Sequence, residues 1–124
     1  MKVLIVDDSR VLRTHMSRLM RAMGWHTDEA ENGKRALECL RADRSFELAL
    51  MDVNMPEMNG IECVRRLRSE LPELDMKLMM VTTEADSGLI ADVLANGADE
   101  FLMKPFTREN LQAKLQLLSL PVRA

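Results

Sequence analysis

The chain has 124 residues, 47% of them apolar and 30% charged, and a formal net charge of −3. That composition is typical of one globular domain, and the mildly acidic balance argues against a nucleic-acid-binding module, which usually carries a basic stripe. No apolar run approaches the roughly 20 residues that span a bilayer, and the N-terminal run 3–6 is too short for a signal peptide. We therefore expect a single cytoplasmic domain over 1–124, without membrane insertion or a nucleic-acid partner.

Cysteine and histidine are too sparse for a disulfide framework or a zinc site. Cys39 and Cys63 lie far apart and form no CxxC pair, and His15 and His26 form no cluster with them. We expect both thiols to be reduced, as in a cytosolic protein.

Short apolar runs alternate with stretches of helical periodicity along the chain. We predict strands over 3–6, 25–29, 47–51, 77–81 and 100–103. The helices that follow them are predicted over 11–23, 33–40, 61–71, 85–95 and 111–118. Because strand and helix alternate five times, we expect a parallel sheet with helices on both faces and right-handed crossovers.

The helical spacing also indicates which side chains face the core. In the first helix the stripe comprises Val11, Leu12, His15, Met16, Leu19, Met20 and Met23. In the last helix the inward stripe comprises Leu111, Leu115 and Leu118. A displaced stripe there is either a wider core face or a partner-docking surface, and it comprises Ala113, Leu117 and Leu120. Most of the eleven methionines should fill gaps in the core, for example Met16, Met20, Met51, Met79 and Met103.

Polar residues follow four of the predicted strands. They are Asp7 and Asp8 after the first, Asp52 after the third, Thr82 and Thr83 after the fourth, and Lys104 after the fifth. In an open doubly wound sheet, ligands bind beyond the carboxyl ends of the strands. These side chains are therefore expected to form one site.

The residue types suit phosphoryl transfer assisted by a cation. Clustered carboxylates repel one another, and ligands that are all oxygen select Mg²⁺, Ca²⁺ or Mn²⁺. A carboxylate can attack phosphorus to give an acyl phosphate, while a hydroxyl and an ammonium neutralise the oxygens of the transferred group. Asp52, Thr82 and Lys104 fill these three roles.

Each of these residues also has a simpler explanation when it is considered alone. Asp7 or Asp8 would commonly cap the helix that follows, Thr82 would cap the fourth helix, and Lys104 would be a solvated charge. The convergence of all of them on one sheet edge favours the functional interpretation.

Four segments match a known family together: 3–9, 50–60, 81–84 and 97–106. Here the chain resembles the response-regulator receiver family, most closely its single-domain chemotaxis regulators, and the match covers nearly the whole chain. The resemblance implies an α/β, flavodoxin-like fold with a doubly wound five-stranded parallel sheet in the order 2-1-3-4-5. Departures from the chemotaxis pattern are Val53, Thr83 in place of a common alanine, and Phe101 in place of tyrosine.

The resemblance implies a role for each residue of the site. Asp52 corresponds to the phospho-acceptor. Asp8 corresponds to the direct Mg²⁺ ligand, Asp7 acts mainly through water, and the backbone carbonyl of Asn54 completes the metal set. Thr82 and Lys104 correspond to the pair that grips the phosphoryl oxygens.

Further positions are implied to tune and transmit the phosphorylated state. Backbone amides near Asn54 and Thr83 should complete the anion site, and Asn54 and Glu84 should control access of the hydrolytic water. Thr82 and Phe101 occupy the switch positions, with plain core packing as the alternative for Phe101. The Lys104-Pro105 bond is expected to be cis.

The implied function is a phosphorylation-activated switch of a two-component system with Mg²⁺ as cofactor. It would receive a phosphoryl group from a histidine kinase or histidine phosphotransfer protein, and it would catalyse this transfer and its own dephosphorylation without being a conventional enzyme. Output would pass through a surface of the fourth helix, fifth strand and fifth helix that includes Lys114. The fourth helix should yield most easily, because Gly88 lies near its start. A monomer is expected, with weak dimerisation as the alternative.

Other functions remain open at this stage. A phosphorelay shuttle or a phosphate sink would use the same residues. An Mg²⁺-dependent aspartyl phosphatase usually needs an acid two residues past the nucleophile, where this chain has Asn54. A flavodoxin-like nucleotide binder would need a Gly/Ser/Thr-rich loop in place of Asp7-Asp8. An unphosphorylated scaffold would not need every reactive position to be filled.

Overall fold

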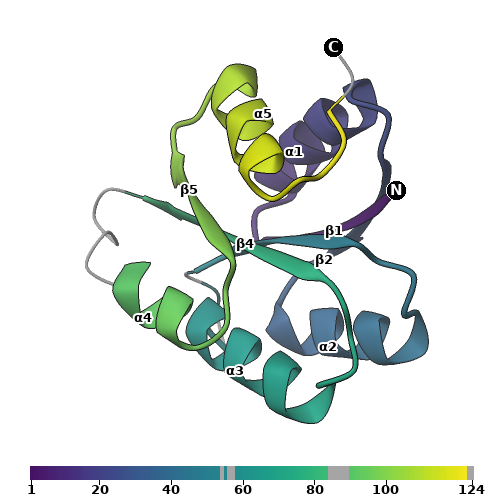
Figure 1. The fold of residues 1–124 in the computed structure, drawn as a ribbon, viewed down its shortest axis with the longest axis vertical. Helices are drawn as coiled ribbons and strands as arrows, with labels where there is room; N and C mark the ends of the chain where they lie inside the picture. The colour runs from purple at the N-terminus through teal and green to yellow at the C-terminus, as the bar shows by residue number, and fades with distance from the viewer. Residues whose placement is uncertain (54, 56–57, 84–89, 123–124) are drawn as a thin grey trace.

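Strand and helix alternate five times within residues 1–53, 55, 58–83 and 90–122, which the computed structural model describes (Figure 1). The strands are β1 Lys2–Val6, β2 His26–Ala30, β3 Leu48–Asp52, β4 Lys77–Thr83 and β5 Glu100–Lys104. The helices are α1 Arg10–Ala22, α2 Gly33–Ala42, α3 Gly60–Glu70, α4 Ile90–Ala95 and α5 Arg108–Leu117. The predicted order of elements is confirmed, although the start predicted for the fourth helix, including Gly88, lies outside the described residues.

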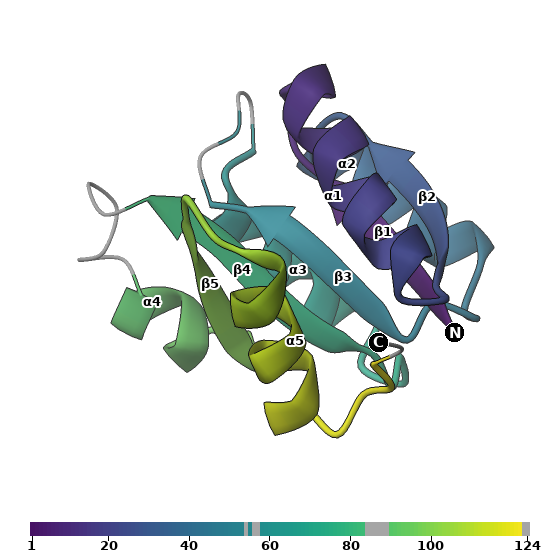
Figure 2. The same cartoon turned by 90° about the horizontal axis from the view of Figure 1, so that it is seen from above.

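All strand pairs in the sheet are parallel, and the order is β2-β1-β3-β4-β5, which confirms the expected topology (Figure 2). β3 lies in the middle and is buried along its whole length. A strand that is buried on both faces has to be apolar throughout, and Leu48–Asp52 departs from this only at its last residue. The departure places a carboxylate at the centre of one sheet edge.

Two apolar clusters cover the two faces of the sheet. α1 and α5 pack on one face, and α2, α3 and α4 pack on the other (Figure 1). Alternate residues of β1 divide between the clusters, since Leu4 and Val6 join one while Val3 and Ile5 join the other. This alternation is the period of two that a β-strand imposes on its side chains.

Side-chain caps fix where four of the helices begin. Ser9, Asn32, Asn59 and Thr107 each accept a hydrogen bond from the backbone N–H three residues later. Such caps satisfy donors that the first turn leaves unpaired. Asp8, between the end of β1 and the cap residue Ser9, is exposed.

The predicted stripe of α1 was wrong at two positions. Val11 is 79% exposed and His15 is also exposed, whereas Met16 and Met20 are buried. At 3.6 residues per turn, Val11 lies about 140° and His15 about 100° around the helix axis from Met16. A helix that packs on a sheet buries only residues that lie closer than this to the centre of its apolar stripe.

Smaller differences concern the other apolar predictions. Trp25 is buried, but it precedes β2 instead of beginning it. Leu120 packs against the core, so the displaced stripe of α5 reduces to Ala113 and Leu117, which are exposed. Met103 is half-buried, while the other four methionines that were named are fully buried. None of the described helices is long and apolar enough to cross a membrane.

The two cysteines have different environments, and neither forms a disulfide. Cys63 on α3 is fully buried, and its thiol donates to the carbonyl of Gly33 on α2 at 3.6 Å. Burial raises the pKa of Cys63 to about 12. Cys39 is only half-buried.

We expect one fast-reacting thiol per folded chain. The thiolate is the reactive form. Cys63 is buried from solvent, and its raised pKa keeps the thiol protonated at neutral pH. Titration with a chromogenic disulfide at neutral pH should release one equivalent from the native protein and two after unfolding, and the Cys39→Ser variant should show no fast phase. Two equally fast thiols in the native protein would contradict this assignment.

Candidate functional site

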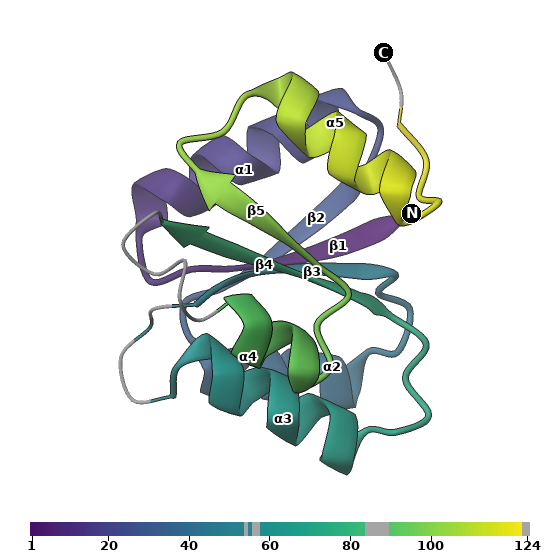
Figure 3. The same ribbon diagram turned by 60° about the vertical axis from the view of Figure 1, so that its left-hand side comes forward.

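The carboxyl ends of the strands meet at one edge of the sheet. Val6 at the end of β1 pairs with Met51, the residue before Asp52, and Thr83 pairs with Lys104 at the ends of β4 and β5. Figure 3 shows the arrowheads of β4 and β5 pointing to this same side. Strand register therefore brings the ends of β1, β3, β4 and β5, which carry most of the predicted site residues, to one edge.

Asp7 is a fully buried carboxylate that is held in place from several directions. Its Oδ1 accepts from the backbone N–H of Ser9 at 2.8 Å, and its own N–H donates to the carbonyl of Ala30 at 3.2 Å. Its carbonyl accepts from the guanidinium of Arg13 at 2.7 Å. The acid pair is thus anchored through Asp7, while Asp8 extends into solvent.

Asp52 ends β3 with a side chain that is 10% exposed. Gly60 passes directly over this strand end, since a Cβ placed there would lie 2.7 Å from the carbonyl oxygen of Asp52 and 2.8 Å from the Cα of Val53. The Gly60 N–H also donates to the Val53 carbonyl at 2.8 Å. The start of α3 therefore encloses Asp52 from one side, and only glycine fits there without displacing backbone.

Lys104 brings a positive charge between two of the acids. Its Nζ lies 3.5 Å from Oδ2 of Asp7 and 3.5 Å from Oδ1 of Asp52, and its side chain is 18% exposed. Ion pairs that are largely shielded from solvent, as here, are stronger than those on an open surface. The lysine thus links the ends of β1, β3 and β5.

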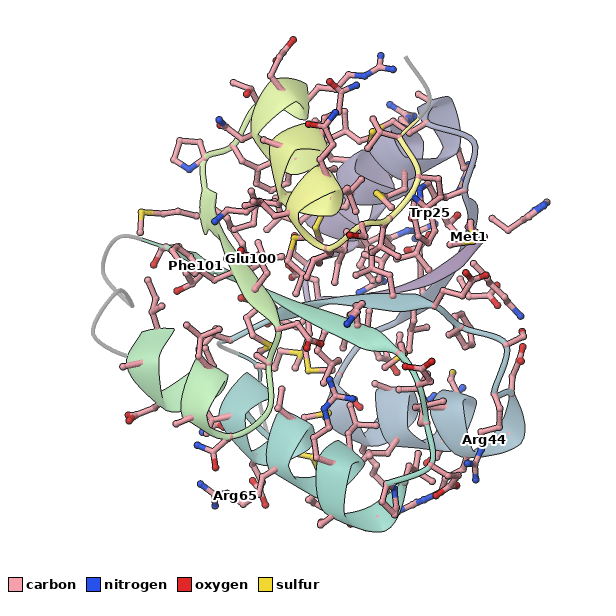
Figure 4. All side chains as sticks on the ribbon, viewed as in Figure 1. Met1, Trp25, Arg44, Arg65, Glu100 and Phe101 are labelled. Atoms are coloured by element: carbon pink, nitrogen blue, oxygen red, sulfur yellow. The ribbon has the colours of Figure 1, made fainter. Side chains whose placement is uncertain are left out.

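Thr82 is 1% exposed, and its hydroxyl donates to the carbonyl of Thr83 at 3.3 Å. The simpler role predicted for Thr82 was a helix cap, and residues 84–89, which separate it from α4, lie outside the described residues. Phe101, the predicted switch residue, is half-buried on β5 at the edge of the sheet (Figure 4).

A lysine that the sequence had placed on the output surface contacts Phe101 directly. The Lys114 Nζ lies 4.2 Å from the centroid of the Phe101 ring and donates to Oε1 of Glu100 at 3.1 Å. Both distances are within the range of favourable cation–π and charge-assisted contacts. The ring is therefore held from the side of α5.

Asp7, Asp8 and Asp52 fit a site for a hard divalent cation. One carboxylate oxygen from each lies within 4.8 Å of the others. All three donors are oxygen, and Asp8 is exposed whereas Asp7 and Asp52 are buried. Mg²⁺ binds through a small number of carboxylates and retains several waters, so the donor set and its exposure match this ion.

The charges in the site are not balanced by the protein alone. Three carboxylates face the one ammonium of Lys104 among the described residues. Burial raises the pKa of Asp7 above its usual value, and the carboxylate of Asp8 raises it further, while the bond from Ser9 and the charge of Lys104 oppose the shift. Among the described residues, the site therefore carries more negative than positive charge.

Some of the predicted site residues lie outside the described part of the chain. These are Asn54 and Glu84, so the implied backbone ligand and the control of water access are not placed. The Lys104-Pro105 peptide is cis, as the resemblance implied.

The sequence analysis did not identify two residues that contact the site. Arg13 reaches the Asp7 carbonyl, and Gly60 closes over Asp52. A glycine directly after the N-cap Asn59 was a signal for close backbone approach. Arg13 had no such signal, since arginines recur along α1.

Comparison with known proteins identifies related sequences over almost the whole chain. The profile of the response regulator receiver domain matches residues 3–116. The "Chemotaxis protein CheY homolog" of Campylobacter jejuni is 38% identical over 118 residues, covering 94% of this chain and 90% of the relative. The "Chemotaxis protein CheY1" of Helicobacter pylori is 34% identical and covers 95% and 96%.

A solved structure agrees with these sequence matches. Chemotaxis protein CheY4 of Vibrio cholerae superposes with a TM-score of 0.84 at 34% identity, covering 94% of this chain and 96% of that one. At 34% identity, the similarity of fold and the similarity of sequence support the same family relationship.

We expect Mg²⁺ to stabilise the fold, because it would relieve the repulsion among the three acids. At ten times its Kd, one-site linkage gives about 1.4 kcal/mol. Asp52→Asn should raise the melting temperature without metal and reduce the gain from Mg²⁺, whereas Asp75→Asn, an exposed acid elsewhere, should change neither. A melting temperature that does not respond to saturating Mg²⁺ would count against the site.

Proposed function

Because the chain belongs to the response regulator receiver domain family, we propose that it is a phosphorylation-activated switch in which Asp52 accepts the phosphoryl group. The domain is that of a CheY-like response regulator. The donor is a histidine kinase or a histidine phosphotransfer protein, and the reaction requires Mg²⁺. We place the protein in the cytoplasm.

One observation carries this proposal: Lys104 lies at 3.5 Å from both Asp7 and Asp52, inside a cluster of three acids. A helix cap or a solvated lysine would not need this arrangement. A nucleophilic carboxylate beside a cation site and a movable ammonium is what phosphoryl transfer requires.

The acidic cluster supplies the residues that would hold Mg²⁺. Asp8 and Asp52 would bind it through carboxylate oxygens and Asp7 mainly through water, with the carbonyl of Asn54 as a further ligand. When bound, the ion neutralises the charge that develops on the phosphoryl oxygens. The fully buried position of Asp7 suits an indirect role, whereas Asp8 is open to solvent and to the ion.

Three side chains carry out the transfer in this proposal. An oxygen of Asp52 attacks phosphorus as the bond from phosphorus to the donor imidazole breaks, which leaves an acyl phosphate on Asp52. Lys104 moves its ammonium from the carboxylates to a phosphoryl oxygen. Thr82 exchanges its bond to the Thr83 carbonyl, 3.3 Å in this structure, for a bond to another phosphoryl oxygen.

The output begins with the movement of Thr82. Met80 pairs with Phe101 and Thr82 with Met103, so Thr82 and Phe101 project from the same face of the sheet. Drawing Thr82 toward the phosphoryl group opens space that the half-buried ring of Phe101 can fill. Fully burying a Phe side chain is worth about 1.5–3 kcal/mol, enough to shift a two-state equilibrium by about tenfold or more.

The surface that changes lies over β5 and α5. A hollow of about 440 Å³ between them is lined by Phe101, Lys104, Pro105, Ala113 and Lys114 among others. Leu117, 69% exposed, extends this surface along α5. Its apolar and cationic character suits a protein segment that carries apolar and acidic side chains.

Several roles use the same chemistry within this family. The chemotaxis names of the relatives in Campylobacter and Helicobacter favour a chemotaxis-type regulator, and a phosphorelay shuttle or phosphate sink is the alternative. An aspartyl phosphatase is disfavoured because Asn54 occupies the position of the usual acid. Capture of partners by the beryllofluoride-activated protein separates an output regulator from a sink.

We expect acetyl phosphate to label Asp52 alone, and only with Mg²⁺ present. Intact mass should increase by one phosphoryl group, and peptide mapping should place it at Asp52. Lys104→Ala should still bind Mg²⁺, but it should fail to propagate the switch, since one phosphoryl oxygen loses its cation. A stable adduct on Asp52→Asn at the wild-type rate would refute the assignment.

We expect Phe101→Ala and Leu117→Glu to weaken partner binding or self-association while leaving phosphorylation of Asp52 nearly intact. Both residues lie on the proposed output surface, and neither belongs to the acidic cluster of Asp7, Asp8 and Asp52. Ala42→Glu, an exposed position on α2 at the other face of the sheet, provides a charge-matched control. If both variants bind the activated-state partner as wild type does, the output surface lies elsewhere.

A further inference from the structure

Arg13 connects the acid pair to the neighbouring strand. It lies one turn into α1, with a side chain that is 15% exposed. One terminal nitrogen of its guanidinium donates to the carbonyl of Asp7 at 2.7 Å, and its Nε donates to Oε1 of Glu29 on β2 at 3.1 Å. One planar group thus bridges the end of β1 and the end of β2.

The opposite end of this bridge is also fixed. The second carboxylate oxygen of Glu29 accepts from the hydroxyl of Ser17, a fully buried polar side chain on α1, at 3.3 Å. Glu29 therefore holds Arg13 in one orientation and neutralises its charge. The guanidinium can donate to Asp7 without adding net positive charge beside a cation site.

The bond to the Asp7 carbonyl has a direct consequence for Asp8. That carbonyl belongs to the planar peptide unit that joins the two residues, so fixing the oxygen fixes the plane from which the Asp8 Cα departs. The carboxylate of Asp8 is exposed and has no hydrogen bond to any residue within the described segments. The orientation of the Asp8 carboxylate is therefore set by the backbone of the residues before and after it.

On the other side the backbone is already constrained. Ser9 caps α1 and donates its N–H to Asp7 Oδ1, and its carbonyl accepts from the N–H of Arg13 at 2.9 Å. The Asp7 N–H is bound to Ala30. With Arg13 in place, both peptide units that flank Asp8 are hydrogen-bonded.

We infer that Arg13, oriented by Glu29, is a positioning residue that aims Asp7 and Asp8 at the divalent cation. This inference rests on the proposed Mg²⁺ site and adds the element that preorganises it. Arg13 acts through the Asp7–Asp8 backbone and touches neither the cation nor the phosphoryl group.

The test is a direct measurement of Mg²⁺ affinity by calorimetry on folded protein, without any phosphodonor. Arg13→Gln should weaken Mg²⁺ binding about tenfold, the lower end of what outer-shell partners of metal ligands contribute. Arg13→Lys should weaken Mg²⁺ binding to a similar extent, because one ammonium cannot reproduce the planar fork. Glu29→Gln should weaken Mg²⁺ binding less, since the hydrogen bond from Arg13 to Asp7 remains.

Arg18→Gln is the matched control. Arg18 is an exposed arginine on the same helix and makes no hydrogen bond or ion pair with the residues that the structure describes, so its loss changes the charge equally. Its Mg²⁺ affinity should equal that of wild type. In phosphorylation by acetyl phosphate, Arg13→Gln should need about tenfold more Mg²⁺ for half-maximal rate and reach nearly the wild-type rate at saturation.

Two results would overturn the inference. Wild-type Mg²⁺ affinity in Arg13→Gln would show that the bridge does not position the acids. Wild-type affinity in Arg13→Lys, or an equal loss in Arg18→Gln, would show that only charge matters. These failures differ from failure of the proposed function, in which the wild-type protein itself would neither bind Mg²⁺ nor become phosphorylated.

Discussion

The ammonium of Lys104, placed between the buried carboxylate of Asp7 and that of Asp52, is the interaction on which the site depends. It ties the ends of three strands together, and it leaves a surplus of negative charge because three acids face it within the described residues. That surplus makes the site receptive to a divalent cation. The same lysine can leave the carboxylates once a phosphoryl oxygen competes for it. In the proposed function, this contact of the resting fold is also the one that changes on activation.

The surroundings of this ion pair are rigid on one side and adjustable on the other. Asp7 is fixed by Ser9, Ala30 and Arg13, and the close passage of Gly60 confines Asp52. Toward β4 and β5, the described segments include polar contacts that can be exchanged. Thr82 holds its neighbour's carbonyl by one bond, and Phe101 lies half-buried under Lys114. In the proposed switch, charge added at Asp52 would be transmitted toward the β5 and α5 edge, where contacts can be exchanged.

Most of the fold and the inner part of the site could be predicted from the sequence. Alternating apolar runs predicted a parallel sheet whose strand ends share an edge. The family resemblance supplied the strand order, and together they predicted that Asp7, Asp52, Thr82 and Lys104 would converge. What could not be predicted depends on helix rotation and on contacts between elements. The exposure of Val11 follows from how α1 is turned on the sheet. The bridge from Arg13 to Glu29 depends on that rotation as well as on the register of β2, and neither has a signature in the local sequence.

The central claim is that the three acids hold a divalent cation beside a phosphorylatable Asp52 from which Lys104 can be drawn away. A crystal grown with Mn²⁺ and beryllofluoride tests it most directly, because Mn²⁺ is located by its anomalous scattering. We expect one metal peak in contact with Asp8 and Asp52, beryllofluoride bonded to Asp52, and the Lys104 ammonium on a fluorine instead of Asp7. A metal peak away from these acids, or Lys104 still paired with Asp7 beside bound beryllofluoride, would contradict the account.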